Sequence, residues 1–243
     1  MAVESIVSGN TKPLVPLFSK RTDCVYTSCF CEENVWKLCQ EVATKHGSEL
    51  QHCYVAFISN PGRSVPLWRQ RSGKDEDKIV LWDYHVILIY APDERAVVYD
   101  LDSELPFPTH FWKYATETFR RDEALPPEWH RMFRLVSASD YLKHFASDRQ
   151  HMKRKDGSWI KTPPDYSPIS TPTCTDNLDS FIDMDPNTGL GTVMSLKQLF
   201  DRFYRSNVAP QPPPPPPPQA QAQAQATPTN GLRKHADMPS ALV

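Results

Sequence analysis

Four of the six cysteines lie within residues 22–39, which read TDCVYTSCFCEENVWKLC. A cysteine whose thiolate is stabilised is a strong nucleophile and can carry out acyl transfer. Later residues of this stretch recur at the spacing of one apolar helix face: Val35, Leu38, Cys39 and Val42. One turn earlier the same face reaches Cys31, whereas Cys29 lies about 200° around the helix at ~100° per residue. We therefore identify Cys31 as the inward-facing thiol.

A thiol in the first turn of a helix lies beside unpaired backbone N–H groups and the positive end of the helix dipole. Both favour a thiolate and can hold a developing oxyanion. Thr27 or Ser28 is placed to cap that turn. Glu32 and Glu33 oppose a thiolate by like-charge repulsion, so Cys31 needs a cationic partner from elsewhere in the chain. Taken alone, the stretch also fits ordinary buried cysteines of a reduced protein.

The clearest strand pattern of the chain supplies a histidine and an acid. Residues 79–90 (IVLWDYHVILIY) and 96–101 (AVVYDL) read as two strands joined by a tight turn at APDER. A turn centred on APDE places His85 opposite Asp100, and a shift of the centre by one residue pairs His85 with Asp102 instead. In either register a carboxylate lies on the face of the histidine with Cβ atoms ~4.5–5.5 Å apart, close enough to orient the imidazole.

Cysteine, histidine and acid in this order are what a thiol acyl-transfer enzyme requires. His85 would take the proton of Cys31, and Asp100 would fix the tautomer and stabilise the imidazolium. Three other interpretations remain open. His85 could be a buried histidine without a catalytic role, the protein could be a cysteine protease or transglutaminase built on the same fold, or it could be a non-catalytic scaffold with a proline-rich tail. A zinc module is a further alternative, although the spacing C-x4-C-x-C-x7-C differs from the C-x2–4-C pairs of structural zinc sites.

Composition argues against several classes of protein. The formal net charge is only -2, which gives no reason to expect nucleic acid or an anionic membrane as a partner. The N-terminus lacks a signal-peptide pattern, and no apolar stretch approaches the ~20 residues of a membrane span. We therefore expect a cytoplasmic protein with reduced cysteines, with the nucleus as an alternative location. We also expect a monomer.

The chain divides into three predicted regions. Residues 1–21 read as a flexible lead-in, 22–207 as one catalytic domain, and 208–243 as a disordered tail rich in Pro, Gln and Ala. Seven consecutive prolines, 212–218, favour a polyproline II segment. That segment could contact a profilin, SH3 or WW partner, or it could be a spacer without a partner.

Several motifs together resemble a known family. The segments CVYTSCFCEENVWKLC, WDYHVIL, YDLDSELPFP, YLKHFASDRQHMK and FIDMDP, in this order, closely resemble protein N-terminal glutamine amidohydrolases over residues 23–203. The resemblance implies an α+β fold with a papain/transglutaminase-like core, in which the helix bearing the cysteine packs on an antiparallel sheet bearing the histidine and the aspartate. It also implies that Cys31, His85 and Asp100 form the catalytic triad.

The implied reaction hydrolyses the side-chain amide of an N-terminal glutamine in a protein or peptide. It yields glutamate and ammonia through a γ-glutamyl thioester, feeds the N-degron pathway of protein turnover, and needs no metal or cofactor. Selectivity for a terminal residue requires a contact with the free α-ammonium group, and asparagine is one methylene shorter. Candidate substrate-binding residues are Ser28, Glu32, Asp83 and Asp102, with Glu33 as a further carboxylate. Each of these carboxylates also fits a solvated or structural role. Trp82 and Tyr84 flank the histidine. The motif residues Ser147, Asp148 and Arg149 receive no role from the sequence.

Overall fold

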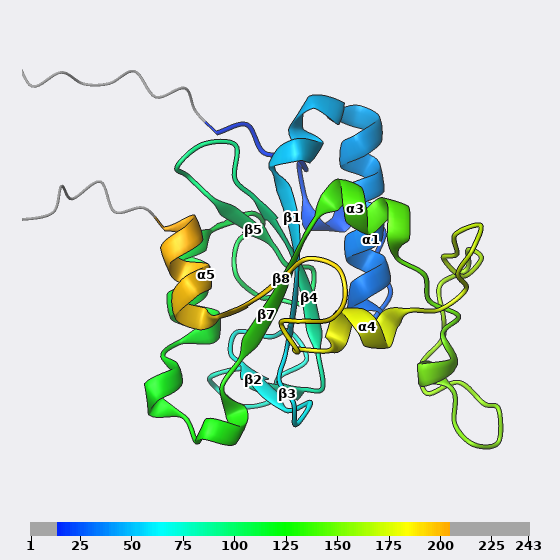
Figure 1. Cartoon of the computed structure of the whole chain (residues 1–243). Coiled ribbons are helices and arrows are strands. Elements are labelled where there is room, and N and C mark those ends of the chain that lie inside the picture. The colour runs from blue at the N-terminus through cyan, green and yellow to red at the C-terminus, as the bar shows by residue number, and fades with distance from the viewer. Residues whose placement is uncertain (1–13, 205–243) are drawn as a thin grey trace, which may run out of the picture. The chain divides into compact units, whose positions relative to one another are not determined.

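The computed structural model describes residues 14–204 (Figure 1). Its main sheet has six antiparallel strands in the order β6-β5-β4-β1-β7-β8. In chain order they are β1 (Cys53–Ser59), β4 (His85–Tyr90), β5 (Val97–Tyr99), β6 (Thr109–His110), β7 (Met132–Ser137) and β8 (Thr192–Ser195). A separate two-stranded sheet pairs β2 (Val65–Leu67) with β3 (Val80–Trp82).

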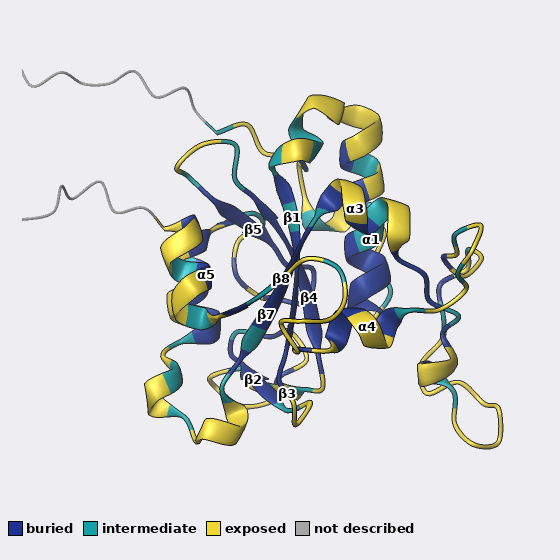
Figure 2. Cartoon of the chain, in the orientation of Figure 1, coloured by how far each residue is buried: buried dark blue, intermediate teal, exposed yellow. Residues whose placement is uncertain are grey.

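Helices cover both faces of the main sheet, as Figure 1 shows with α1, α3 and α4 on one side and α5 on the other. Their bounds are α1 (Cys31–Lys45), α2 (Phe111–Tyr114), α3 (Ala138–His144), α4 (Leu178–Ile182) and α5 (Leu196–Phe203). A short π-helical turn, Ala115–Phe119, continues α2. The strands between the helices are buried (Figure 2). Helices packed on an antiparallel sheet confirm the predicted α+β class.

Strand β1 runs through the middle of the sheet and separates two apolar cores. Val55 and Phe57 belong to the core under α1, whereas Ala56 and Ile58 belong to the core on the opposite face. All four are fully buried because successive side chains of a strand point to opposite faces and helices cover both. Its sequence, CYVAFIS, is rich in the β-branched and aromatic residues that favour a strand.

The predicted hairpin is present, but its first strand is broken. Residues 79–90 form β3 and β4, with a break at Asp83 and Tyr84, where Asp83 Oδ1 accepts the Tyr84 backbone N–H at 2.9 Å. Strands β4 and β5 pair Leu88 with Tyr99. This is the register shifted by one residue, so the register centred on APDE is wrong. Six residues, rather than four, separate the last paired residues of the two strands.

Part of the expected N-terminal lead-in packs against the domain. Leu17 and Phe18 are each 5% exposed, and the Leu17 N–H donates a hydrogen bond to the Tyr99 hydroxyl at 2.8 Å. Burial of these two large apolar side chains favours an ordered segment before residue 22. The predictions for residues 1–13 and for the tail at 208–243 fall outside the described residues. Within residues 14–204, no helix has the length and apolar composition needed to cross a membrane.

Candidate active site

Cys31 is the first residue of α1, and its side chain faces the core. It is 6% exposed and packs in the same cluster as Val35, Leu38 and Cys39. The inward orientation predicted from helical spacing is therefore confirmed. Cys29 lies before the helix in a left-handed conformation with φ of 68° and is partly exposed.

The start of α1 is fixed by a residue inside the helix rather than by a capping hydroxyl. The N-cap residue is Phe30, so the expectation that Thr27 or Ser28 caps the helix is wrong. Instead the Asn34 side chain accepts the Thr27 N–H at 2.8 Å and donates to the Thr27 carbonyl at 2.8 Å. These two bonds fasten the preceding turn onto the helix. The Tyr141 hydroxyl of α3 donates to the Glu32 carbonyl at 2.9 Å and anchors the first helical turn from the other side.

His85 and Asp100 form a buried hydrogen-bonded pair. His85 Nε2 lies 3.0 Å from Asp100 Oδ1, and the two side chains are 1% and 2% exposed. By register His85 aligns with Asp102, but β5 ends at Tyr99 and the chain turns there, which brings Asp100 to the ring. The other ring nitrogen, Nδ1, is buried and has no hydrogen-bond partner among residues 14–204.

Each member of this pair stabilises the charge of the other. Burial alone would lower the pKa of His85, but the nearby Asp100, Asp102 and Glu32 carboxylates raise it above its ordinary value. Burial alone would raise the pKa of Asp100, but His85, the Tyr114 hydroxyl and the Asp102 backbone N–H hold it below its ordinary value. The pair therefore stabilises an imidazolium beside a carboxylate once the imidazole takes up a proton.

Two aromatic residues hold the pair in place. The Tyr114 hydroxyl donates to Asp100 Oδ2 at 2.7 Å from the opposite layer of the fold. The Trp82 ring stacks on the His85 imidazole with centroids 5.0 Å apart and planes inclined by 20°. The position of Trp82 beside the histidine could be anticipated from the WDYH motif, whereas no sequence signal linked Tyr114 to Asp100.

Cys31 lies beside the start of β4, against the residues that flank His85. The Val86 backbone amide is close enough to the thiol to lower its pKa. Glu32 Oε2 accepts one hydrogen bond from the Tyr84 hydroxyl, at 2.9 Å, and another from the Cys31 thiol, at 3.7 Å. Within the described part of the chain, Cys31 Sγ forms no hydrogen bond with the imidazole. Catalytic hydrogen bonds are often long in ligand-free enzymes and shorten when substrate binds.

The thiol is protonated in this arrangement. Burial raises the pKa of Cys31 well above its ordinary value, and the charges of Glu32, Asp102 and Asp83 raise it further. The Val86 backbone amide acts in the opposite direction but does not outweigh them. Reaction therefore requires a base that takes the thiol proton, and the unpaired His85 Nδ1 has the chemistry for that step.

The four predicted substrate-binding residues have different surroundings. Ser28 and Asp83 are exposed, whereas Glu32 and Asp102 are buried. The Tyr26 hydroxyl donates to Asp102 Oδ1 at 2.6 Å, and burial raises the pKa of Asp102. Burial also raises the pKa of Glu32, to about 7.

Two residues of the motif formed by Ser147, Asp148 and Arg149 have structural roles. Arg149 is 3% exposed and forms a two-bond ion pair with Glu33, with both N–O distances 2.7 Å. It also donates to the Pro164 and Tyr166 carbonyls, which ties the following loop to α1. Ser147 is buried, and its backbone N–H donates to the Ile169 carbonyl of the same loop.

One cluster among the described residues has donor atoms arranged as in a metal site. His85, Asp100 and Asp102 each offer a ligand atom, all within 4.8 Å of one another. Several of these atoms already serve other bonds, since Asp100 binds both the imidazole and Tyr114, and Asp102 binds Tyr26. The cluster fits a hydrogen-bonded charge pair at least as well as a cation site.

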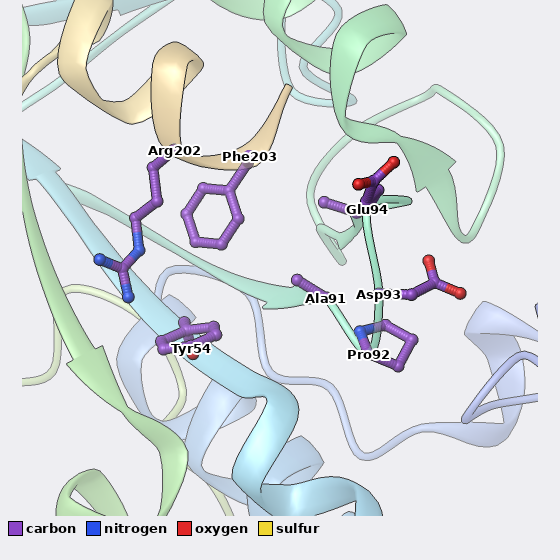
Figure 3. Close-up of a pocket in the computed structure, with 8 residues that line it drawn as sticks. Tyr54, Ala91, Pro92, Asp93, Glu94, Arg202 and Phe203 are labelled. Atoms are coloured by element: carbon purple, nitrogen blue, oxygen red, sulfur yellow. The ribbon is translucent and has the colours of Figure 1, made fainter. Parts of the chain in front are cut away.

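A cavity of about 490 Å³ lies at the other end of β4 (Figure 3). Tyr54, Arg202 and Phe203 line one side of it, and the turn from Ala91 to Glu94 lines the other. His85 begins β4 and Ala91 follows its last residue, so about six residues at ~3.3 Å each, or ~20 Å, separate them. This cavity is distinct from the site around Cys31.

Known proteins resemble this chain over most of its length. Residues 26–203 match the family model of N-terminal glutamine amidase. Proteins named protein N-terminal glutamine amidohydrolase from Drosophila grimshawi, Drosophila mojavensis and Drosophila melanogaster are each 54% identical to this chain over 191 residues. The alignments cover 78% of this chain and 93% of each relative. The chain therefore belongs to the N-terminal glutamine amidase family.

Proposed function

We propose that this protein converts the N-terminal glutamine of proteins and peptides to glutamate, with release of ammonia. Membership of the amidase family supports the amide hydrolysis and the terminal glutamine as its target. The observation that carries the proposed mechanism is the buried His85–Asp100 pair. His85 Nδ1 has no hydrogen-bond partner among the described residues, and His85 lies on β4, the strand against which Cys31 packs.

In the first half-reaction, His85 Nδ1 takes the proton of Cys31, and the sulfur attacks the side-chain carboxamide carbon of the substrate. Asp100 keeps the imidazole oriented and stabilises the imidazolium that forms. The first backbone hydrogen bond of α1 runs from the Asn34 N–H to the Phe30 carbonyl. The amide groups of residues 31–33 precede it, so they can donate to the oxyanion.

The imidazolium then gives its proton to the departing amide nitrogen, and ammonia leaves. A γ-glutamyl thioester remains on Cys31. In the second half-reaction, neutral His85 takes a proton from water, which attacks the thioester carbonyl and regenerates the thiol. Water supplies the oxygen of the new carboxylate, and the peptide backbone of the substrate is not cleaved.

The core fold and the cellular role of the protein are part of the same proposal. The helix bearing Cys31 against the strand bearing His85 supports a papain/transglutaminase-like core. A cytoplasmic or nuclear monomer that acts in the N-degron pathway remains our prediction from the sequence. The proposed contacts of the proline-rich tail fall outside the described residues.

The proposal is tested by ammonia release from three matched peptides that begin with Gln, Asn and acetyl-Gln. We expect release from the Gln peptide alone, and a loss of several orders of magnitude with Cys31→Ala. Mass spectrometry of the product distinguishes the rival thiol enzymes. A cleaved peptide would indicate a protease, and an incorporated amine would indicate a transglutaminase. Undiminished activity of Cys31→Ala would refute the proposed nucleophile.

A further inference from the structure

Glu32, the residue after Cys31, is a buried carboxylate with one oxygen that accepts no hydrogen bond. The residue is 0% exposed, and its Oε2 accepts hydrogen bonds from Tyr84 and from the Cys31 thiol. Its Oε1 is buried and accepts no hydrogen bond from any residue in the described range 14–204. His151 Nε2 lies 3.8 Å from Oε1, beyond hydrogen-bond distance, and burial lowers the pKa of His151, which disfavours its charged form. Leaving a buried carboxylate oxygen without a hydrogen bond destabilises a fold, so the arrangement suits a site that a ligand completes.

We propose that Glu32 binds the free α-ammonium group of the substrate and thereby selects an N-terminal glutamine over an internal one. This inference rests on the function proposed above. An ammonium group offers the donor that Oε1 lacks, and the charge-assisted bond would offset the burial of the carboxylate. An internal glutamine has an uncharged amide N–H at the same position and gains much less from the contact.

The distances around Cys31 allow both contacts at once. Cys31 Sγ lies 3.7 Å from Glu32 Oε2, and Oε1 is bonded to the same carbon, so Oε1 is at most about 6 Å from the sulfur. In glutamine, four bonds join the carboxamide carbon to the α-nitrogen, a span of about 5 Å when extended. An attack distance of ~3–3.5 Å at sulfur and a hydrogen bond of ~2.8 Å at the carboxylate close the remaining two sides. The reacting carbon and the ammonium can therefore lie against neighbouring residues of one helical turn.

The other carboxylates near Cys31 are less suited to this contact. Glu33 is occupied by both nitrogens of its ion pair with Arg149. Asp102 accepts a hydrogen bond from Tyr26 and lies beside the His85–Asp100 pair, where its charge raises the pKa of the imidazole. Asp83 is exposed, so water competes for its charge.

The same contact would also activate the nucleophile. The charge of Glu32 raises the pKa of Cys31, which disfavours the thiolate in the free enzyme. A bound ammonium neutralises that charge and removes the repulsion. The thiol is then easiest to deprotonate when a terminal residue occupies the site, so selectivity should affect kcat as well as KM.

The test compares Glu32→Gln with wild type on two peptides. One begins with Gln, and in the other a hydrogen replaces the α-amino group of that Gln, which keeps the carboxamide and its chain length. We expect wild type to prefer the amine, and Glu32→Gln to reduce the ratio of the two kcat/KM values by about 10- to 100-fold. The matched control is Glu49→Gln, which removes a carboxylate that accepts a hydrogen bond from Tyr90 away from this site. It should keep the wild-type ratio.

Three results of this comparison would overturn the role proposed for Glu32. An equal loss on both peptides would show that Glu32 is only structural and would overturn the inference. A collapse of the ratio in Asp83→Asn instead of Glu32→Gln would overturn it too. Wild type that releases ammonia from neither peptide would reject the proposed function and, with it, this inference.

If Glu32→Gln does not fold, as judged by circular dichroism, the pH dependence of the wild-type ratio replaces it. Cys31, Tyr84 and His151 face Glu32, but their titration affects both peptides and cancels in the ratio. The ratio should rise with pH as Glu32 ionises, since its pKa is about 7. It should fall above about pH 8, where the α-amino group loses its proton. A ratio that is flat across this range would contradict a carboxylate–ammonium contact.

Discussion

Replacement of Asp100 by Asn tests the role of the buried charge pair. The change keeps the size of the side chain and its capacity to hydrogen-bond His85 Nε2, but it removes the negative charge. The two groups are 3.0 Å apart and nearly inaccessible to water. At an effective dielectric constant of about 20, charges ~3–5 Å apart interact by about 3–5 kcal/mol. Because the imidazolium forms during the reaction, losing this energy should reduce kcat by about 10²- to 10⁴-fold.

The pH dependence of kcat/KM in Asp100→Asn is a second test of the charge pair. Asp100 raises the pKa of His85, so the neutral base form is populated only above that raised value. Without the carboxylate the pKa of His85 falls, and the acid limb of kcat/KM should move to lower pH in Asp100→Asn.

Initial rates of ammonia release over a range of Gln-peptide concentrations, from pH 5 to 9, give kcat and kcat/KM and so measure both effects. The control is Asp93→Asn, which removes an exposed carboxylate from the turn of the same hairpin. It should leave the rate unchanged. A kcat of Asp100→Asn within about threefold of wild type, or an unmoved acid limb, would refute the role assigned to the pair.

Three further changes test the surroundings of the site. Tyr114→Phe leaves an oxygen of buried Asp100 without its donor and should lower the free energy of unfolding in urea by about 1.5–3 kcal/mol; an unchanged urea midpoint would contradict this. Arg149→Met leaves Glu33 buried and unpaired and should cost about 3–5 kcal/mol, against about 0–1 kcal/mol for the exposed pair removed by Arg120→Met. Equal losses in these two variants would refute the structural role of the buried pair. Incubation with EDTA should leave ammonia release unchanged, and lost activity that zinc restores would show that the histidine–aspartate cluster holds a metal.

The features that sequence predicted well depend on local patterns. Helical spacing in residues 31–42 was enough to place Cys31 on the buried face of α1, because the period of a helix fixes the face of each residue. Likewise the short apolar run CYVAFIS, bounded by polar residues and a turn, predicts a strand with the bounds observed for β1.

The hairpin shows where local patterns become ambiguous. Residues 79–90 form one continuous run rich in apolar residues, so nothing in their composition marks the break at Asp83. A register error of one residue changed the formal partner of His85 from Asp102 to Asp100. Both carboxylates lie on the same face, and only the end of β5 at Tyr99 decides which of them reaches the ring.

Contacts between distant segments were not predictable from one sequence. Arg149 and Glu33 are 116 residues apart, and each resembles an ordinary surface charge when read in its own segment. The bond from Tyr114 to Asp100 depends on the packing of α2 against the sheet. These contacts arise from tertiary packing, which neither helical nor strand periodicity encodes.

The most direct test of the central claim is a covalent adduct on Cys31. Asp100→Asn, in which the chemical steps should be slow, is mixed with a Gln peptide, quenched in acid and mapped by mass spectrometry. We predict an adduct with the mass of the peptide less ammonia, located on Cys31 and released by hydroxylamine. Ammonia release without any adduct, or an adduct on another residue, would contradict the proposed thioester mechanism.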